Sequence, residues 1–107
     1  MISKEAVKVE EKQRDYELTL VISPEIGEEA LDTAIAKVSQ LITGKGGIIS
    51  QTDKWGKKKL AYPIRHFMEG TYVLIKLKLQ PALSKQLEAN LEISEDVLRY
   101  LLIKMDG

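Results

Sequence analysis

The sequence predicts an α+β domain in which two helices cover one face of a four-stranded antiparallel sheet. Apolar side chains take alternate positions near residues 16–22 and 71–79, which is typical of strands, and they recur at helical spacing between residues 28 and 43. The chain has 107 residues, of which 44% are hydrophobic and 30% charged. That size and composition fit one folded domain rather than a disordered or fibrous chain.

The first half of the chain predicts a strand, a helix and a second strand. Residues 1–14 are polar and lack periodicity, so we expect a flexible N-terminal extension there and a single domain over 15–105. Alternation from Tyr16 to Ile22 predicts the first strand, and one apolar stripe predicts a helix from about Glu28 to Thr43. The glycines at 44–47 end this helix, because glycine adopts the left-handed conformation without a Cβ clash.

The second half predicts the same order of elements. A long strand runs over Ile48–Ile64, with an irregularity at Gly56, and Pro63 requires an edge or a bulge because it donates no hydrogen bond. We expect a turn over Arg65–Gly70. A strand over Thr71–Leu79, a helix starting at Pro81 with Leu83, Leu87 and Leu91 on one face, and a last strand over Val97–Lys104 complete the domain.

The order strand-helix-strand-strand-helix-strand is that of the ferredoxin-like βαββαβ sandwich. Right-handed crossovers place both helices on the same face of the sheet, and the other face stays open. On the open face we expect both polar and aliphatic side chains, including Glu17, Thr19, Val21, Tyr72, Leu74, Lys76, Lys78 and, if Arg99 points outward, Val97, Leu101 and Ile103.

That mixed face suits a protein partner better than single-stranded RNA. RNA-recognition domains of this topology stack bases on aromatic residues of the central strands, and Tyr72 is the one aromatic residue expected there. Aliphatic side chains beside lysines favour a protein partner, because monomers seldom leave large apolar patches in water. The candidate partner-protein surface consists of Tyr72, Leu74, Lys76, Arg99, Leu101 and Ile103.

The residues that could carry catalysis or bind a metal are few. The absence of cysteine excludes thiolate metal sites, cysteine nucleophiles and thiol redox chemistry. His66 is the only histidine and has no obvious carboxylate partner, and a solvated helix start explains Glu28, Glu29 and Asp32. We therefore expect no enzyme, no metal site and no cofactor. The mixed charges of the first residues do not resemble a signal peptide, and no segment approaches the roughly 20 apolar residues of a membrane span, so we expect a cytoplasmic protein.

A basic segment stands out in a chain whose formal net charge is zero. Such a sum argues against nucleic-acid binding, but the distribution of charge matters more. Lysines on a surface often serve only to keep the protein solvated, or they protect a sheet edge from pairing. Here, however, Trp55 and Arg65 favour a surface that binds phosphate or RNA, because they add a flat ring and a forked donor. The candidate RNA-binding residues of this segment are Lys54, Trp55, Lys57, Lys58, Lys59 and Arg65.

The same segment must also be held to the domain. Side chains of an extended chain alternate between two faces, so Lys58 cannot share a side with Lys57 and Lys59. We expect Leu60 and Tyr62 to hold the strand to the domain. If they are buried, truncating either one to alanine should lower the free energy of unfolding by about 2 to 5 kcal/mol.

The stretch from Trp55 to Ile64, WGKKKLAYPI, resembles the Trp-Gly-basic-basic-x-Leu-Ala-Tyr-Pro-Ile signature of the bacterial small-subunit ribosomal protein S-six family. The opening residues 14–17, the glycines 46–47 and the segment 70–74 are also similar to that family, as is the last strand with Arg99 and Lys104. The resemblance covers about residues 14 to 104. Two features differ: the segment before Arg14 is longer, and the acidic C-terminal extension of some members is missing.

This resemblance implies a structural protein of the small (30S) ribosomal subunit that binds 16S ribosomal RNA together with ribosomal protein S-eighteen. It implies Arg14, Lys57 and Lys58 as RNA contacts, with Lys59 at a variable position. We expect the isolated protein to be monomeric. The alternative is a ferredoxin-like regulatory or self-associating domain that binds a small molecule. A hydrolase of this topology comes third, because it needs an arginine and an asparagine around a loop, and Asn90 is the only asparagine.

Overall fold

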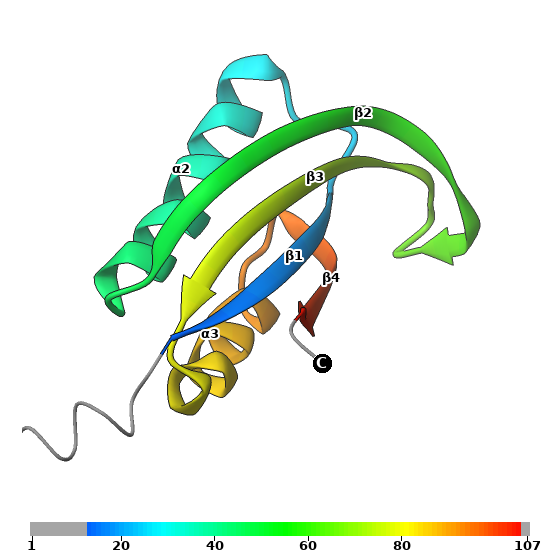
Figure 1. Ribbon diagram of the computed structural model, residues 1–107. Helices are drawn as coiled ribbons and strands as arrows, with labels where there is room; N and C mark the ends of the chain where they lie inside the picture. Colours follow the sequence, from blue (N-terminus) through cyan, green and yellow to red (C-terminus); the bar gives the residue numbers. More distant parts are fainter. Residues whose placement is uncertain (1–12, 106–107) are drawn as a thin grey trace, which may run out of the picture.

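The computed structural model describes residues 13–105 and confirms the predicted ferredoxin-like sandwich. Its sheet has the strand order β2-β3-β1-β4 with antiparallel neighbours, and both helices lie on the same face (Figure 1). The predicted N-terminal extension falls mostly on residues 1–12, which lie outside the described residues. The elements are β1 (Arg14–Ile22), α2 (Glu28–Gly44), β2 (Ile48–Ile64), β3 (Phe67–Leu79), α3 (Pro81–Glu92) and β4 (Val97–Lys104).

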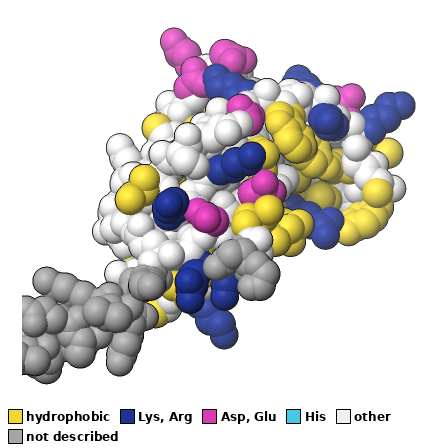
Figure 2. Space-filling view, in the orientation of Figure 1, with side chains coloured by type: hydrophobic (Ala, Val, Ile, Leu, Met, Phe, Trp, Pro, Cys, Tyr) yellow, Lys and Arg dark blue, Asp and Glu magenta, His cyan; other side chains and the backbone are white. Residues whose placement is uncertain are grey.

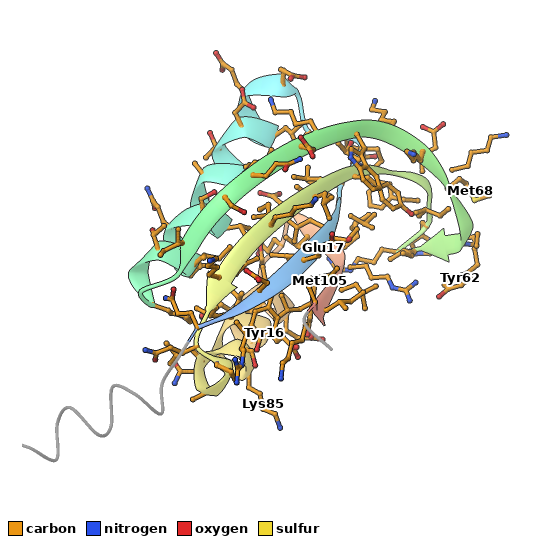
Figure 3. All side chains as sticks on the ribbon, in the orientation of Figure 1. Tyr16, Glu17, Tyr62, Met68, Lys85 and Met105 are labelled. Carbon is orange, nitrogen blue, oxygen red and sulfur yellow. The ribbon has the colours of Figure 1, made fainter. Side chains whose placement is uncertain are left out.

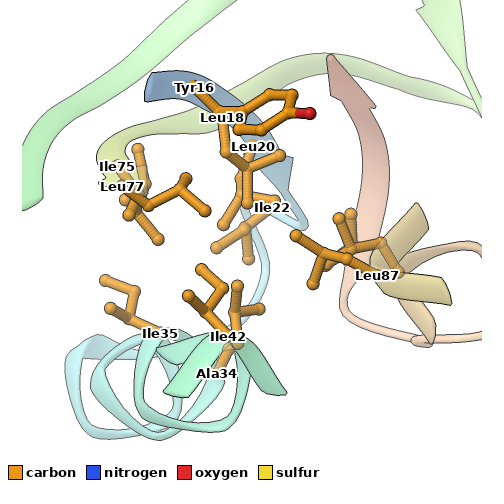
Figure 4. Close-up of a cluster of buried hydrophobic side chains, with 14 of the residues drawn as sticks. Tyr16, Leu18, Leu20, Ile22, Ala34, Ile35, Ile42, Ile75, Leu77 and Leu87 are labelled. Atoms are coloured by element: carbon orange, nitrogen blue, oxygen red, sulfur yellow. The ribbon is translucent and has the colours of Figure 1, made fainter. Parts of the chain in front are cut away.

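The core lies between the sheet and the two helices (Figure 4). Alternate residues of the two central strands fill it, as their period of two requires. Helix α2 adds the predicted apolar stripe, and α3 adds Leu87 and Leu91. The buried side chains of the strands and of α2 are Tyr16, Leu18, Leu20, Ile22, Val73, Ile75, Leu77, Leu79, Leu31, Ala34, Ile35, Val38 and Ile42.

The turn between α2 and β2 depends on its glycines, as predicted. Gly46 has a φ of 82°, a conformation in which a Cβ is unfavourable. The N–H of Gly47 donates to the carbonyl of Ile42 at 2.9 Å. A Cβ on Gly47 would lie 2.7 Å from Ile42 Cγ2 and 3.0 Å from the carbonyl oxygen of Lys78. The close approach of helix and strand therefore requires glycine at this position.

Strand β4 confirms the predicted span but corrects the placement of Val97. Val21 pairs with Arg99 whereas Ile22 pairs with Val97, so the register shifts by one residue at this point. A shift of one residue moves a side chain to the opposite face. Val97 therefore packs in the core at 3% exposure, and the prediction that it lies on the open face was wrong.

The hairpin of β2 and β3 is longer than expected. Strand β3 begins at Phe67, so the turn consists of Arg65 and His66, both with positive φ values as in a type I′ turn. The prediction of a turn over Arg65–Gly70 was wrong. The irregularity at Gly56 is confirmed by its φ of 85° and a register shift beside it, and Pro63 lies on an edge strand, as predicted. The far end of this hairpin curves back toward β4 (Figure 1).

Candidate nucleic-acid interface

The three consecutive lysines lie on the far half of β2, on both faces of the hairpin. Lys57 pairs with Thr71, which is buried on the helix side, and Lys58 pairs with Gly70 on the other side. Lys57 and Lys59 line one hollow of about 510 Å³ on the helix side, together with Phe67. The alternation predicted from the sequence is therefore present, and all three lysines are exposed.

Trp55 and Lys58 form one unit on this segment. The Lys58 Nζ lies 5.2 Å from the centroid of the Trp55 ring, a cation–π distance. Trp55 is 51% exposed, so the ring leaves much of its surface to solvent. Among residues 13–105, no carboxylate forms an ion pair with Lys57, Lys58 or Lys59. These side chains can therefore offer their charge and a flat ring to a polyanion.

Lys54 differs from the other lysines of the basic segment. Its ammonium group donates to Asp32 and lies 3.5 Å from Glu28, so it joins β2 to the start of α2. The hydrogen bond to Asp32, with the charges of both carboxylates, raises the pKa of Lys54 above its ordinary value. Two of the three acidic residues expected at a solvated helix start, Glu28 and Asp32, thus neutralise Lys54, and this lysine has an intramolecular role.

The structure does not gather every candidate RNA residue in one place. Arg14 pairs with Leu79 at one end of β3, whereas Lys57 pairs with Thr71 near the other end. Arg65, in the hairpin turn, lines a hollow with the end of α3 and the start of β4. The coherent group is Trp55 with Lys57, Lys58 and Lys59.

The open face carries the six residues of the candidate partner surface in three cross-strand rows. The rows run from β3 through β1 to β4 and join Tyr72 with Arg99, Leu74 with Leu101, and Lys76 with Ile103. Leu101 is 56% exposed and Ile103 44%. Figure 2 shows hydrophobic side chains interspersed with lysine and arginine. This face is neither wholly polar nor wholly apolar, as expected.

Tyr62 and Leu60 do not anchor the hairpin by burial. Tyr62 is 57% exposed at the outer end of the hairpin (Figure 3), and Leu60 is half-buried. The expected cost of about 2 to 5 kcal/mol applies to buried side chains, so the prediction was wrong for Tyr62. Instead, Arg99 Nη1 donates to the Tyr62 hydroxyl at 2.7 Å. This contact has no signal in the sequence, because the residues are 37 positions apart and no local pattern joins them.

The described residues contain no group of three or more histidine, aspartate or glutamate side chains placed to hold a metal ion. No helix within that part of the chain is long and apolar enough to cross a membrane.

The fold and its surfaces define a class of protein. It is a small ferredoxin-like domain with a basic hairpin and a half-apolar sheet face, and these surfaces suit binding rather than catalysis. A family model described as "Ribosomal protein S6" matches residues 15–104. The chain belongs to this family, which comprises structural, non-enzymatic proteins of the small ribosomal subunit in the bacterial cytoplasm.

Relatives and a solved structure agree with the family. The "Small ribosomal subunit protein bS6" of Moorella thermoacetica is 44% identical over 93 residues, which are 87% of this chain and 95% of the relative. The protein of that name from Caldanaerobacter subterraneus is 44% identical over 87% of this chain and 98% of its own. The crystal structure of 30S ribosomal protein S6 from Thermotoga maritima has a TM-score of 0.81 at 26% identity, covering 87% of this chain and 88% of that chain. The resemblance seen in the sequence is confirmed.

Proposed function

We propose that this chain binds 16S ribosomal RNA in the small subunit together with ribosomal protein S-eighteen. The RNA meets the hairpin, and the partner protein covers the open face of the sheet. The observation that supports this proposal most is the group of Lys57, Lys58 and Lys59, exposed beside Trp55 and without ion pairs among the described residues. Arg14 and Arg65 are additional RNA contacts on this proposal, whereas Lys54 contributes least.

The charges of the chain imply that the partner supplies part of the RNA affinity. The formal net charge is zero, and Lys54 is neutralised within the chain. Each phosphate neutralised on duplex RNA or DNA contributes a slope of roughly 0.9 to the dependence of log affinity on log salt. Three hairpin lysines give a modest slope, so the isolated protein binds RNA weakly. On this proposal the isolated protein is monomeric.

The first test replaces Lys57, Lys58 and Lys59 by alanine and measures RNA affinity across a salt series, with the partner present. We expect weaker binding and a slope reduced by roughly 0.9 for each phosphate that the variant no longer neutralises. The control replaces Lys37 and Lys85, two exposed lysines of the helices, and should leave both quantities unchanged. An unchanged slope and affinity in the hairpin variant would remove these lysines from the interface.

The second test concerns the open face. Leu101→Glu puts a charge on an exposed apolar position of this face. The control, Ile93→Glu, puts a charge on an exposed apolar position elsewhere, just beyond the end of α3, where the side chain is 78% exposed. Affinity for ribosomal protein S-eighteen should fall at least about tenfold in the first variant, because a charge is left unpaired in an interface. It should not change in the second. Sedimentation of the isolated protein tests the alternative of a self-associating domain, because such a domain gives a stable dimer.

A further inference from the structure

We propose that Arg99 and Tyr62 are positioning residues, whose contact fixes the far end of the β2–β3 hairpin before RNA binds. This inference rests on the proposed function, because it assigns the two residues to the placement of Lys57, Lys58 and Lys59. It gives Arg99, a candidate for the partner surface, a role within the chain. It gives Tyr62 a role that does not depend on burial.

The contact joins the two opposite edges of the sheet. Tyr62 belongs to β2 and Arg99 to β4, and these are the first and last strands in the order β2-β3-β1-β4. One guanidinium makes both interactions: Nη1 donates to the tyrosine hydroxyl at 2.7 Å, and Cζ lies 5.8 Å from the ring centroid. Figure 3 shows Tyr62 at the outer end of the hairpin. The hairpin therefore reaches across the end of β1 to the far edge strand.

The segment that carries the lysines has little other support. The pairing of β3 with β1 ends where Thr71 meets Ile22, so residues 67–70 of β3 pair with β2 alone. A two-stranded ribbon is marginally stable by itself in water. The close approach of Gly70 to Val21 fixes the base of this ribbon. The Arg99–Tyr62 contact attaches the ribbon to β4 near its other end.

An attached ribbon loses less freedom when it binds RNA than an unattached one. Ordering of a loop or side chain on binding subtracts from the affinity, and a group held in its bound position avoids that cost. The hydrogen bond and the ring contact are exposed, so their effect is modest. A net contribution typical of one hydrogen bond changes an opening equilibrium by roughly two- to tenfold.

The test compares Tyr62→Phe, Arg99→Lys and the double variant, by amide hydrogen exchange over residues 58–68 and by RNA affinity with the partner bound. Each single variant should raise exchange at the end of the hairpin by roughly two- to tenfold. The double variant should exchange no faster than the faster single one, because both changes remove one interaction. The control is Tyr100→Phe, which removes a hydroxyl of the same strand that donates to Glu92 and should leave the hairpin unchanged.

RNA affinity separates positioning from direct contact. If Arg99 and Tyr62 position the hairpin, each variant lowers affinity by a similar factor and the salt slope stays the same, because the bound protein neutralises the same phosphates. Weaker RNA binding in Arg99→Lys, with no change in Tyr62→Phe, would make Arg99 an RNA contact and overturn the inference, because lysine keeps the charge but loses the forked donor geometry. Unchanged exchange, or additive effects in the double variant, would also overturn it.

Failure of the inference and failure of the proposed function give different results. If the hairpin opens but RNA affinity holds, while the triple lysine variant binds RNA more weakly, the positioning role is refuted and the RNA surface stands. If the triple lysine variant also keeps its affinity, the proposed RNA surface fails, and with it the positioning role.

Discussion

Gly70 lies where the hairpin passes over the end of β1, and replacing it by alanine tests that approach. A Cβ at this position would overlap Cγ1 of Val21 and lie 3.5 Å from Leu60 Cδ2. Carbon atoms pack best at about 3.5 to 4.0 Å, so the new methyl group cannot be accommodated without movement. Val21 is only 6% exposed and is stiff about χ1 because it is β-branched. We expect Gly70→Ala to lower the free energy of unfolding by about 1 to 3 kcal/mol, the usual cost of overpacking.

A double-mutant cycle checks the cause. Val21→Ala removes the methyl group that the new Cβ would meet, and by itself it costs about 1 to 2 kcal/mol because less apolar surface is buried. In the double variant the alanine at 70 takes space that the alanine at 21 vacates. The double variant should therefore be more stable than the sum of the single effects by about 1 kcal/mol or more.

The assay is urea unfolding followed by circular dichroism, with Gly44→Ala as the control. Gly44 is the last residue of α2, and a Cβ there meets nothing within 4 Å. Alanine should be neutral there or stabilise by up to about 1 kcal/mol. A Gly70→Ala variant as stable as the parent, or a strictly additive cycle, would refute the close approach of hairpin and β1.

Three further predictions concern the turn, a pH dependence and the core. His66→Gly should stabilise the protein by about 0.5 to 1 kcal/mol in urea unfolding, because glycine adopts the φ of 73° without a Cβ clash. The hydrogen bond to Glu92 raises the pKa of Tyr100 from 10.0 to about 12. The stabilisation that this hydrogen bond gives the folded protein is therefore complete below pH 10 and lost as the pH rises to 12. Tyr100→Phe should flatten that loss in unfolding curves measured from about pH 9 to 12. Leu87→Ala should cost about 2 to 5 kcal/mol, because this side chain is 0% exposed, whereas Ile93→Ala, at 78% exposure, should stay within about 0.5 kcal/mol.

The topology was predictable because each element has a local signal. Alternation marked β1, the apolar stripe marked α2, and proline marked the start of α3. The short connection between β2 and β3 then left few arrangements of four strands and two helices. The alternation of the three lysines followed from the geometry of an extended chain alone. These inferences needed no knowledge of which distant residues meet.

The wrong predictions concern features that depend on contacts between segments far apart in the sequence. Gly70 was interpreted as a turn residue, but it allows close packing against β1 within a strand. The face of Val97 was wrong because the register shift in β4 beside Val21 has no signature of its own in the sequence. Tyr62 was expected to hold its strand to the domain by burial, yet the curvature of the hairpin decides its surroundings.

If the proposed function holds, the hairpin also explains how a neutral chain carries a phosphate-binding surface and a protein-binding surface side by side. Within the four-stranded sheet, one face of each central strand is covered by helices, and charged side chains on that face would be desolvated. Where β2 runs past the end of β1, its side chains are exposed on both faces, so Lys57 and Lys59 on one side and Lys58 on the other all keep their charge in water. On the proposed function, salt should weaken RNA binding more than partner binding, because the phosphate contacts lie on the ribbon and the exposed aliphatic side chains, Leu101 and Ile103, lie on the sheet. Equal salt dependence of the two associations would show that the same charges serve both.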